Sequence, residues 1–336
     1  MKLRSVAFSL LAASVLAFGG RAVAEVSEIT IADQFGIAYL PLMVMQDKRL
    51  VEKYTQAAGL GTVTVKWAKF AGGGSMNDAL LSGSIDFGVA GLPSLILLWD
   101  KTKDTQNEIE GVCAINNTPM YLNTRNSRIQ SLKDFTPADK IALPSVKVSI
   151  QAITLQMAAA QVFGPENYAK LDPLTVTMRH PDAMVALLSG SGEVTSHFTS
   201  PPFMFQELQK SGIRRVLSSK DVVGDSSFII AYATAKFHKA NPKTVGAFLA
   251  ATEEAMAFIN ANKREAARIY VKRTKGKEAD IPSLMKILND PDVVFSTTPS
   301  GIMKYAAFMY KVGTIKSQPS SWKDLFIPEV HNLPGS

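Results

Sequence analysis

The hexapeptide Ala-Leu-Leu-Ser-Gly-Ser occurs twice in the chain, at residues 79–84 and at residues 186–191. Each copy is typical of a helix end with a glycine stop, and each leads through an acidic residue into a short apolar run. Both runs end at a proline-marked turn, at residues 91–94 and 199–202. The copies start 107 residues apart, far more than the period of a solenoid repeat. We therefore expect one supersecondary unit to be used once in each of two lobes.

Short β-rich runs alternate with helical stretches along most of the chain, which favours an α/β class of fold. The expected strands are residues 29–32, 62–67, 87–90, 110–115, 140–143, 174–178, 195–198 and 228–234, and residues 121–124 are expected to start the second lobe. The expected helices are residues 39–54, 75–82, 92–99, 148–163, 182–189, 203–212, 245–260, 264–273, 283–288 and 302–312.

Two ordered crossings between the lobes are expected, near residues 116–121 and 224–228. They divide the chain into a discontinuous first lobe, residues 25–116 plus 229–336, and a second lobe, residues 117–228. Two Rossmann-like lobes joined in this way form a hinged clamshell with an interlobe cleft.

The first 24 residues have the pattern of a signal peptide. Lys2 and Arg4 form a basic start, residues 6–18 are apolar, and Ala22-Val23-Ala24 fits cleavage beside small residues. The apolar run is too short to span a bilayer, and no cysteine stands at the cut to carry a lipid. The mature chain is therefore expected in the periplasm, starting at Glu25 and without a lipid anchor.

Charge and cysteine content exclude several classes of function. Removing Lys2, Arg4 and Arg21 with the signal lowers the net charge from +7 to +4, and no Lys/Arg block suggests a nucleic-acid partner. An anionic small molecule is compatible with this charge. The single cysteine, Cys113, excludes an intrachain disulfide and is expected to be a buried thiol. Four scattered histidines predict no metal site, and no cofactor is expected.

One candidate site in the first lobe is Gly72-Gly73-Gly74-Ser75, which follows an expected strand and opens a helix. Free N–H groups at a helix start, backed by the helix dipole, favour an anion. We expect Gly73, Gly74 and Ser75 to contact a ligand. The alternative is a flexible turn in which Ser75 is an ordinary helix cap.

The counterpart in the second lobe is the segment 144–149, again between a strand and a helix. Ser145 and Ser149 offer hydroxyl groups, and Lys147 brings a cation to a helix start. A lysine there opposes the helix dipole unless an anion is also bound. A solvated Lys147 is the alternative.

Open α/β sheets place ligands at the carboxyl ends of their strands. The candidates at such ends are Gln34, Phe35, Tyr39, Gly91, Pro93, His197 and Ser200. His197 equally fits a structural histidine, and Tyr39 equally fits core packing. His180, which precedes Pro181, is expected to be a turn or cap residue.

Enzyme signatures are weak in this sequence. Gly-x-Ser-x-Gly and His-Glu-x-x-His are absent. Two matches to Ser-x-x-Lys, at residues 283–286 and 320–323, lack the companion motifs of penicillin-binding enzymes. We therefore expect no catalytic residue.

Taken together, these motifs resemble the nitrate/sulfonate/taurine group of periplasmic substrate-binding proteins of ABC transporters. The resemblance covers nearly the whole mature chain and rests on the order of its motifs: the opening 31–36 with 39–41, Phe70 with the glycine turn before 78–80, Gly83-x-x-Asp86-Phe87-Gly88 leading to Gly91-x-Pro93, residues 131–135, and 180–183 with the second Leu-Leu-Ser-Gly. It implies the type II periplasmic-binding-protein fold, with the ligand held between the lobes.

The resemblance also implies a function. A monomeric binding protein without catalytic activity would deliver a small anion, such as a sulfonate, taurine or nitrate, to an inner-membrane permease and its ATPase. Lys147 and the Thr-Ser-Pro-Pro after His197 depart from the usual pattern, so the resemblance does not determine the identity of the ligand. The same architecture accepts aromatic carboxylates, thiamine precursors and riboflavin.

Two other functions are considered. Relatives of this fold include an enzyme that makes a thiamine pyrimidine with a cofactor lysine, histidines and a cysteine-rich iron site. One cysteine and an export signal argue against that activity. A receptor that presents its ligand-bound form to a membrane sensor is an alternative that the sequence does not separate from transport.

Overall fold

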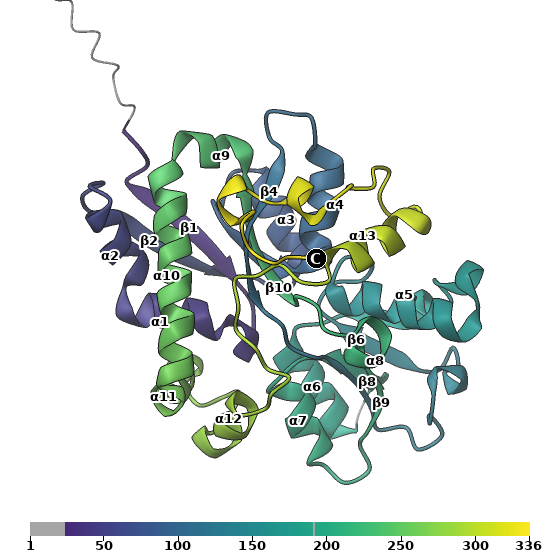
Figure 1. Cartoon of the computed structure of the whole chain (residues 1–336). Coiled ribbons are helices and arrows are strands. Elements are labelled where there is room, and N and C mark those ends of the chain that lie inside the picture. Colours follow the sequence, from purple (N-terminus) through teal and green to yellow (C-terminus); the bar gives the residue numbers. More distant parts are fainter. Residues whose placement is uncertain (1–23, 191) are drawn as a thin grey trace, which may run out of the picture.

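The computed structural model describes residues 24–190 and 192–336 (Figure 1). The predicted signal peptide therefore lies, except for Ala24, outside the described residues. Within the described part of the chain, none of the helices combines the length and apolar character that a membrane span needs.

Five strands of the first lobe form two small sheets. Strand β1 (Glu28–Asp33) pairs in parallel with β2 (Thr64–Lys69). Strand β10 (Ile229–Thr234) lies between β3 (Gly88–Gly91) and β4 (Ile109–Asn116) and is antiparallel to both. A parallel bridge between Ile31 and Phe87 links the two sheets. The chain thus returns to the first lobe through a strand at the centre of a sheet.

The second lobe contains a five-stranded sheet in the order β7-β6-β8-β5-β9. Strand β6 (Lys140–Leu143) is parallel to β7 (Thr175–Thr177) and β8 (Val194–Thr199). Strand β5 (Tyr121–Thr124) is antiparallel to β8 and to β9 (Arg214–Ser218). All five strands fall inside the range predicted for the second lobe, whose exact limits stay a prediction.

Helices cover both groups of strands (Figure 1). They are α1 (Leu40–Lys48), α2 (Leu50–Ala57), α3 (Gly73–Leu81), α4 (Leu92–Thr102), α5 (Ile150–Phe163), α6 (His180–Ser189), α7 (Phe203–Leu208), α8 (Ser219–Val223), α9 (Ala235–Ala240), α10 (Pro242–Ala261), α11 (Lys263–Thr274), α12 (Ile281–Leu288) and α13 (Ile302–Lys311). The long helix α10 packs against α1 and α2, whereas α13 contacts α4 of the first lobe and α5 of the second.

The repeated hexapeptide occupies equivalent places in the two lobes. Its first copy ends α3, where Gly83 has a φ of 73°, and its second copy ends α6, where Gly190 has a φ of 69°. Glycine adopts this left-handed conformation without a steric penalty, so it stops both helices. Strands β3 and β8 follow, as predicted; Ser191, the last residue of the second copy, lies outside the described residues.

Some elements differ from the sequence prediction. The helix expected at residues 39–54 is divided into α1 and α2 at Arg49, which has a φ of 52°. An arginine gives no stop signal, so the break was not expected. Strand β9 was not predicted, because Arg214 and Arg215 interrupt the apolar pattern that indicates a strand. The Arg214 guanidinium donates to the carbonyls of Ser127 and Ile129.

The packing around Gly111 in β4 and Gly246 in α10 predicts that alanine substitutions at these two positions change stability in opposite directions. A Cβ at Gly111 would lie 2.6 Å from Phe326 and 2.9 Å from Leu95, so Gly111→Ala should destabilise the protein by roughly 1–3 kcal/mol. In α10, a Cβ at Gly246 meets nothing within 4 Å, and Gly246→Ala should stabilise by roughly 0.5–1 kcal/mol. Urea unfolding measures both changes; equal stability of the two variants would contradict this packing.

Candidate functional site

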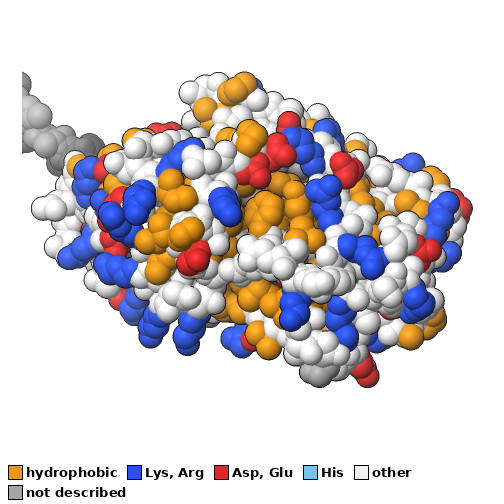
Figure 2. All heavy atoms as spheres, turned by 90° about the horizontal axis from the view of Figure 1, so that it is seen from below, with side chains coloured by type: hydrophobic (Ala, Val, Ile, Leu, Met, Phe, Trp, Pro, Cys, Tyr) orange, Lys and Arg blue, Asp and Glu red, His pale blue; other side chains and the backbone are white. Residues whose placement is uncertain are grey.

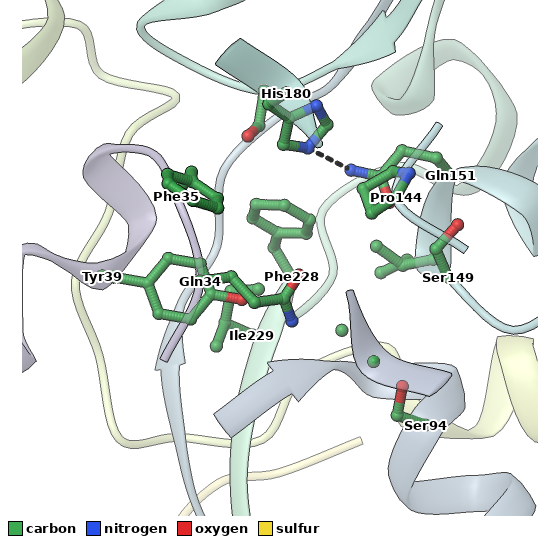
Figure 3. Close-up of a pocket in the computed structure, with 14 residues that line it drawn as sticks. Gln34, Phe35, Tyr39, Ser94, Pro144, Ser149, Gln151, His180, Phe228 and Ile229 are labelled. Atoms are coloured by element: carbon green, nitrogen blue, oxygen red, sulfur yellow. Dashed lines mark hydrogen bonds between the residues drawn. The ribbon is translucent and has the colours of Figure 1, made fainter. Parts of the chain in front are cut away.

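A cavity lies between the two lobes and is lined from both sides (Figure 3). Its lining residues are Gln34, Phe35, Tyr39, Gly73, Gly91, Ser94, Pro144, Ser149, Ile150, Gln151, His180, Ser200, Phe228 and Ile229. The space open to the centre of a water-sized sphere is about 20 Å³, room for roughly one water molecule. The two lobes therefore contact each other closely around this cavity.

Four helices begin at this cavity. Gly73 is the first residue of α3, Gly91 caps α4, Ser149 caps α5 and His180 is the first residue of α6. The first N–H groups of a helix have no partner within that helix, and the helix dipole gives this end a partial positive charge. Two helix starts come from each lobe, so both walls of the cavity favour an anionic group.

The lining contains no Lys, Arg, Asp or Glu side chain, and its titratable groups are Tyr39 and His180. Burial, with the nearby Asp33 and Tyr232, raises the pKa of Tyr39 well above its usual value. Burial, with the neighbouring His197, holds the pKa of His180 well below its usual value. Both side chains are therefore neutral at pH 7, and the cavity offers neutral dipoles rather than fixed cations.

The structure brings seven of the sequence-predicted site residues to the lining: Gln34, Phe35, Tyr39, Gly73, Gly91, Ser149 and Ser200. Six others lie outside it: Gly74, Ser75, Pro93, Ser145, Lys147 and His197. Tyr39 is also a core residue, with 3% of its surface exposed, so the two interpretations of this residue are compatible.

The residues outside the lining have other partners. Gly74 N donates to Ser145 Oγ at 3.3 Å, which joins the two lobes directly. Ser75 Oγ donates back to Gly72 O at 3.1 Å, and because Gly72 is the cap of α3, the alternative that Ser75 caps this helix is wrong. Pro93 is buried in the first turn of α4. Lys147 is exposed and has a left-handed φ of 61°, which places it on the surface of its loop.

His197 takes the structural role that was one of its two expected roles, and His180 takes a place at the cavity that the sequence did not predict. His197 is fully buried behind the cavity wall, where its Nδ1 meets Glu207 Oε1 at 2.5 Å. His180, expected to be a turn or cap residue, lines the cavity instead. Its position follows from α6, which begins at His180 and directs the ring toward β8 and α5.

Seven lining residues were not among the predicted ligand contacts, although Ser94 and Pro144 stand in the candidate segments 91–94 and 144–149: Ser94, Pro144, Ile150, Gln151, His180, Phe228 and Ile229. Most of them lie within two residues of a motif that was singled out, so a wider window around each helix start would have included them. Phe228 and Ile229 belong to the second crossing between the lobes, and only the return of the chain through β10 brings them to the site.

The lobes approach main chain to main chain at glycines. A Cβ at Gly72 would lie 2.4 Å from both Pro144 O and Ser145 Oγ, and one at Gly91 would lie 2.8 Å from Ile150 Cγ2. The backbone bond from Ile37 N to Pro201 O, 3.2 Å long, adds a second direct contact. Side chains larger than glycine at these points would hold the helix starts apart.

Ser94 has a polar atom that is weakly paired within the protein. Its side chain is buried, with 1% of the residue exposed, and its Oγ makes no hydrogen bond of good geometry among the described residues, although it interacts weakly with the Tyr232 hydroxyl. A Cβ at Gly73 would lie 2.3 Å from this oxygen, so Ser94 Oγ stands directly at the start of α3. Since a buried hydroxyl without a hydrogen bond of good geometry is costly, this atom indicates a place for a bound polar group.

Outside the cavity, the cleft widens into a charged groove of about 460 Å³. Its cations are Lys69, Arg179, Arg273, Lys275 and Lys277, and its acids are Asp33, Asp182 and Glu278. Phe35 lines both spaces, and its ring lies 5.2 Å from Lys69 Nζ and 5.8 Å from Arg179 Cζ. Phe35 therefore separates the neutral cavity from a groove with more cations than acids, which attracts anions.

Figure 2 shows the face that carries α7 and α12 at the bottom of Figure 1. Hydrophobic side chains gather in its hollowed centre, and Lys and Arg side chains lie on both sides. A groove of about 250 Å³ opens there between α7 and α12, lined by Pro202, Phe205 and Ile287 among others. The cationic surroundings again favour the approach of anions.

Two α/β lobes with a cleft between them are typical of periplasmic binding proteins, and the structure matches solved structures of the type II periplasmic-binding-protein fold over 90–94% of this chain. The family model described as the NMT1-like family matches residues 22–273, three quarters of the sequence. The chain belongs to the NMT1-like family. A comparison with curated proteins finds no significant match.

Three solved structures illustrate the likeness. The alkanesulfonate-binding protein SsuA from Xanthomonas axonopodis pv. citri, bound to MOPS, has a TM-score of 0.66 and 14% identity, over 94% of this chain and 100% of that one. The periplasmic aliphatic sulphonate binding protein SsuA from Escherichia coli has a TM-score of 0.63 and 17% identity, over 90% of this chain and 92% of that one. The periplasmic nitrate-binding protein NrtA from Synechocystis PCC 6803 has a TM-score of 0.66 and 16% identity, over 89% of this chain and 84% of that one. At these identities the likeness shows the fold.

The contact at Gly72 predicts how far apart the two lobes lie in two variants. Gly72 has an extended φ of −169°, which alanine adopts freely, so Gly72→Ala acts only through its clash with Pro144 and should hold the lobes apart. At Gly74 a Cβ would lie an ordinary 3.5 Å from Ser145 Oγ, so Gly74→Ala is the matched control. Small-angle X-ray scattering should give a larger radius of gyration for Gly72→Ala only; identical curves would contradict the close approach.

Proposed function

We propose that this protein is the periplasmic solute-binding component of an ABC importer. Its ligand is a small organic or inorganic anion, such as a sulfonate, taurine or nitrate, held between the two lobes. Membership of the NMT1-like family supports this proposal, as does the fold shared with proteins described as sulfonate- and nitrate-binding.

The observation that carries the proposal is the convergence of four helix starts on one cavity without charged side chains. Hydrogen bonds from neutral groups to an oxyanion are strong in a site without water, because no solvent competes for them. The hydroxyls of Ser94, Ser149 and Ser200 and the amide of Gln34 supply further donors. An acidic side chain, which would repel such a ligand, is absent from the lining.

Ligand binding is coupled to closure of the lobes. Ligand enters an open form and favours the closed form, because only closure brings both pairs of helix starts against it. The hinge consists of the two crossings, near residues 116–121 and 224–228, which join the first lobe, 25–116 plus 229–336, to the second. The closed monomer then presents its ligand to an inner-membrane permease and its ATPase.

The lining also has an apolar part that favours an organic anion with a short apolar group. Phe35, Tyr39 and Phe228 place aromatic rings at the cavity (Figure 3). An alkanesulfonate combines the charged head and the apolar body that such a lining accepts. An aromatic carboxylate is the second candidate, for which the lobes would close less completely around the larger ring.

Binding without chemistry is proposed for this site. Among the described residues no three or more His, Cys, Asp and Glu side chains group to hold a metal ion. Cys113 is buried in β4, and burial raises the pKa of its thiol, so it is a poor nucleophile. The structural neighbours named above are binding proteins.

Ethanesulfonate and nitrate should both raise the melting temperature of the mature protein. At a ligand concentration one hundred times the dissociation constant, mass action gives about 2.7 kcal/mol of stabilisation. Amine buffers are needed, since common sulfonate buffers would compete. Ethyl methyl sulfone, uncharged and of similar size, is the control and should have no effect. A shift with the sulfone alone, or a product formed during incubation, would contradict an anion-binding protein.

Ser94→Ala should weaken ligand binding with little change in stability. Loss of a weakly paired hydroxyl should leave the free energy of unfolding nearly unchanged, whereas loss of a bond to an anion should cost roughly 1.5–3 kcal/mol of binding, about 10- to 160-fold. Lys147→Ala is the control: because Lys147 is exposed outside the lining, its dissociation constant should stay within about twofold. Unchanged affinity for ethanesulfonate in Ser94→Ala would remove Ser94 from the site.

A further inference from the structure

A buried row of side chains leads from the cavity wall to a carboxylate in the second lobe. Gln151 Nε2 and His180 Nε2 are 3.3 Å apart at the cavity, as Figure 3 shows. His180 Nδ1 lies 2.8 Å from His197 Nε2, and His197 Nδ1 lies 2.5 Å from Glu207 Oε1. His197 and Glu207 have no exposed surface. The row thus connects the ligand cavity to a group that solvent does not reach.

The contacts of this row determine how many protons it holds. Each of the two contacts among His180, His197 and Glu207 needs one proton, because a hydrogen bond cannot join two acceptors. The contact at the cavity receives its hydrogen from the Gln151 amide. Two protons on one carboxyl group and two imidazoles leave a net charge of one negative. His180 then keeps its hydrogen on Nδ1 and presents a lone pair at Nε2.

A third proton has one place to go. Glu207 Oε2 already accepts a bond from Asn123 Nδ2 at 2.9 Å, and the two internal contacts each hold their hydrogen. His180 Nε2, at the cavity, is the acceptor that is left, and its protonation requires the Gln151 amide to turn its NH2 group away so that the ligand or Gln151 Oε1 accepts the new hydrogen. A proton there turns His180 from an acceptor into a donor and neutralises the row as a whole, with the positive charge facing the cavity.

Among the described residues, no other charged group around His180 offsets a proton added at its Nε2. Helix α6 packs against β8, α7 and β6, which contribute His197, Glu207 and the distant Lys140. On its own element, Arg179 and Asp182 pair with each other at 2.6 Å, and α5 has no charged residue. Across the cavity stand Tyr39 and the Asp33–Lys69 pair, and Lys147 is exposed. Without a ligand, burial disfavours the charged form of His180.

We propose that anion binding in this cavity is coupled to the uptake of one proton at His180 Nε2, with His197 and Glu207 holding the countercharge behind the wall. This inference rests on the proposed function and adds a property of the same site. His180 becomes a charged donor only when an anion is present to balance it, so the cavity stays neutral when open. His197 and Glu207 are positioning residues, since they act through His180.

The coupling has a defined sign. Ligand raises the pKa of His180 from a low value in the free protein, so the bound form holds more protons. Affinity therefore increases as pH falls through the window between the two pKa values, by up to tenfold per pH unit, and is constant outside it. Ethanesulfonate and nitrate do not titrate near neutral pH, so any proton taken up belongs to the protein.

The test measures the dissociation constant of ethanesulfonate from pH 5.0 to 8.0, in bis-tris and triethanolamine. We expect affinity to rise toward low pH, and calorimetry in two amines of different ionisation enthalpy should count up to one proton taken up per ligand. Glu207→Gln and His180→Gln should abolish this slope. His238→Gln is the matched control, because His238 contacts Glu110 and Glu329 on another part of the molecule and should keep the slope.

Each outcome decides between the two proposals. Binding with a flat pH profile and no proton uptake overturns the coupling and leaves the proposed function standing. No binding of ethanesulfonate or nitrate at any pH overturns the proposed function and the coupling with it. If Glu207→Gln fails to fold, His180→Gln tests the same proton, and a slope that survives in His180→Gln assigns the proton elsewhere and refutes the inference.

Discussion

The site depends on the approach of two main chains at Gly72. A Cβ there would lie 2.4 Å from Pro144 O, so only glycine lets the start of α3 meet the loop before α5. The same closeness is found at Gly91 against Ile150. Because helix dipoles and first-turn N–H groups act over a short range, their combined effect on a ligand requires this contact. Glycine serves here as a spacer of minimal size between two lobes.

Neutral donors and fixed cations have separate places in the cleft. The cavity lining has no charged side chain, whereas five cations stand in the groove beyond Phe35. Cations in a solvated groove increase the encounter rate with anions but are screened by salt. Oriented dipoles in a closed cavity act at short range and need no partner of opposite charge when the ligand leaves. This separation suits a protein that must both capture a solute and release it.

The path of the chain joins the two lobes at two places. Strand β10 returns from the second lobe into the middle of the β3-β10-β4 sheet, so the first lobe is built from two segments that flank the second lobe in sequence. Under the proposed function, two crossings would restrict an opening of the lobes to a rotation about them. Phe228 and Ile229, at the end of the second crossing and the start of β10, line the cavity. In that proposal, contact of ligand with these two residues would link occupancy of the site to the crossing.

The sequence by itself determined the α/β class, the two repeated units, the helix stops at Gly83 and Gly190 and the glycine and serine helix starts, because such features depend on the backbone preferences of a few neighbouring residues. Only the tertiary structure decided which side chains reach the cavity. Lys147 is turned outward by a left-handed φ of 61°, Ser75 bonds back to Gly72, and His180 stands in front of His197. The place of His180 is set by packing between elements far apart in the chain, which local sequence does not encode, whereas Ser75 and Lys147 are placed by the backbone conformation of their own loops.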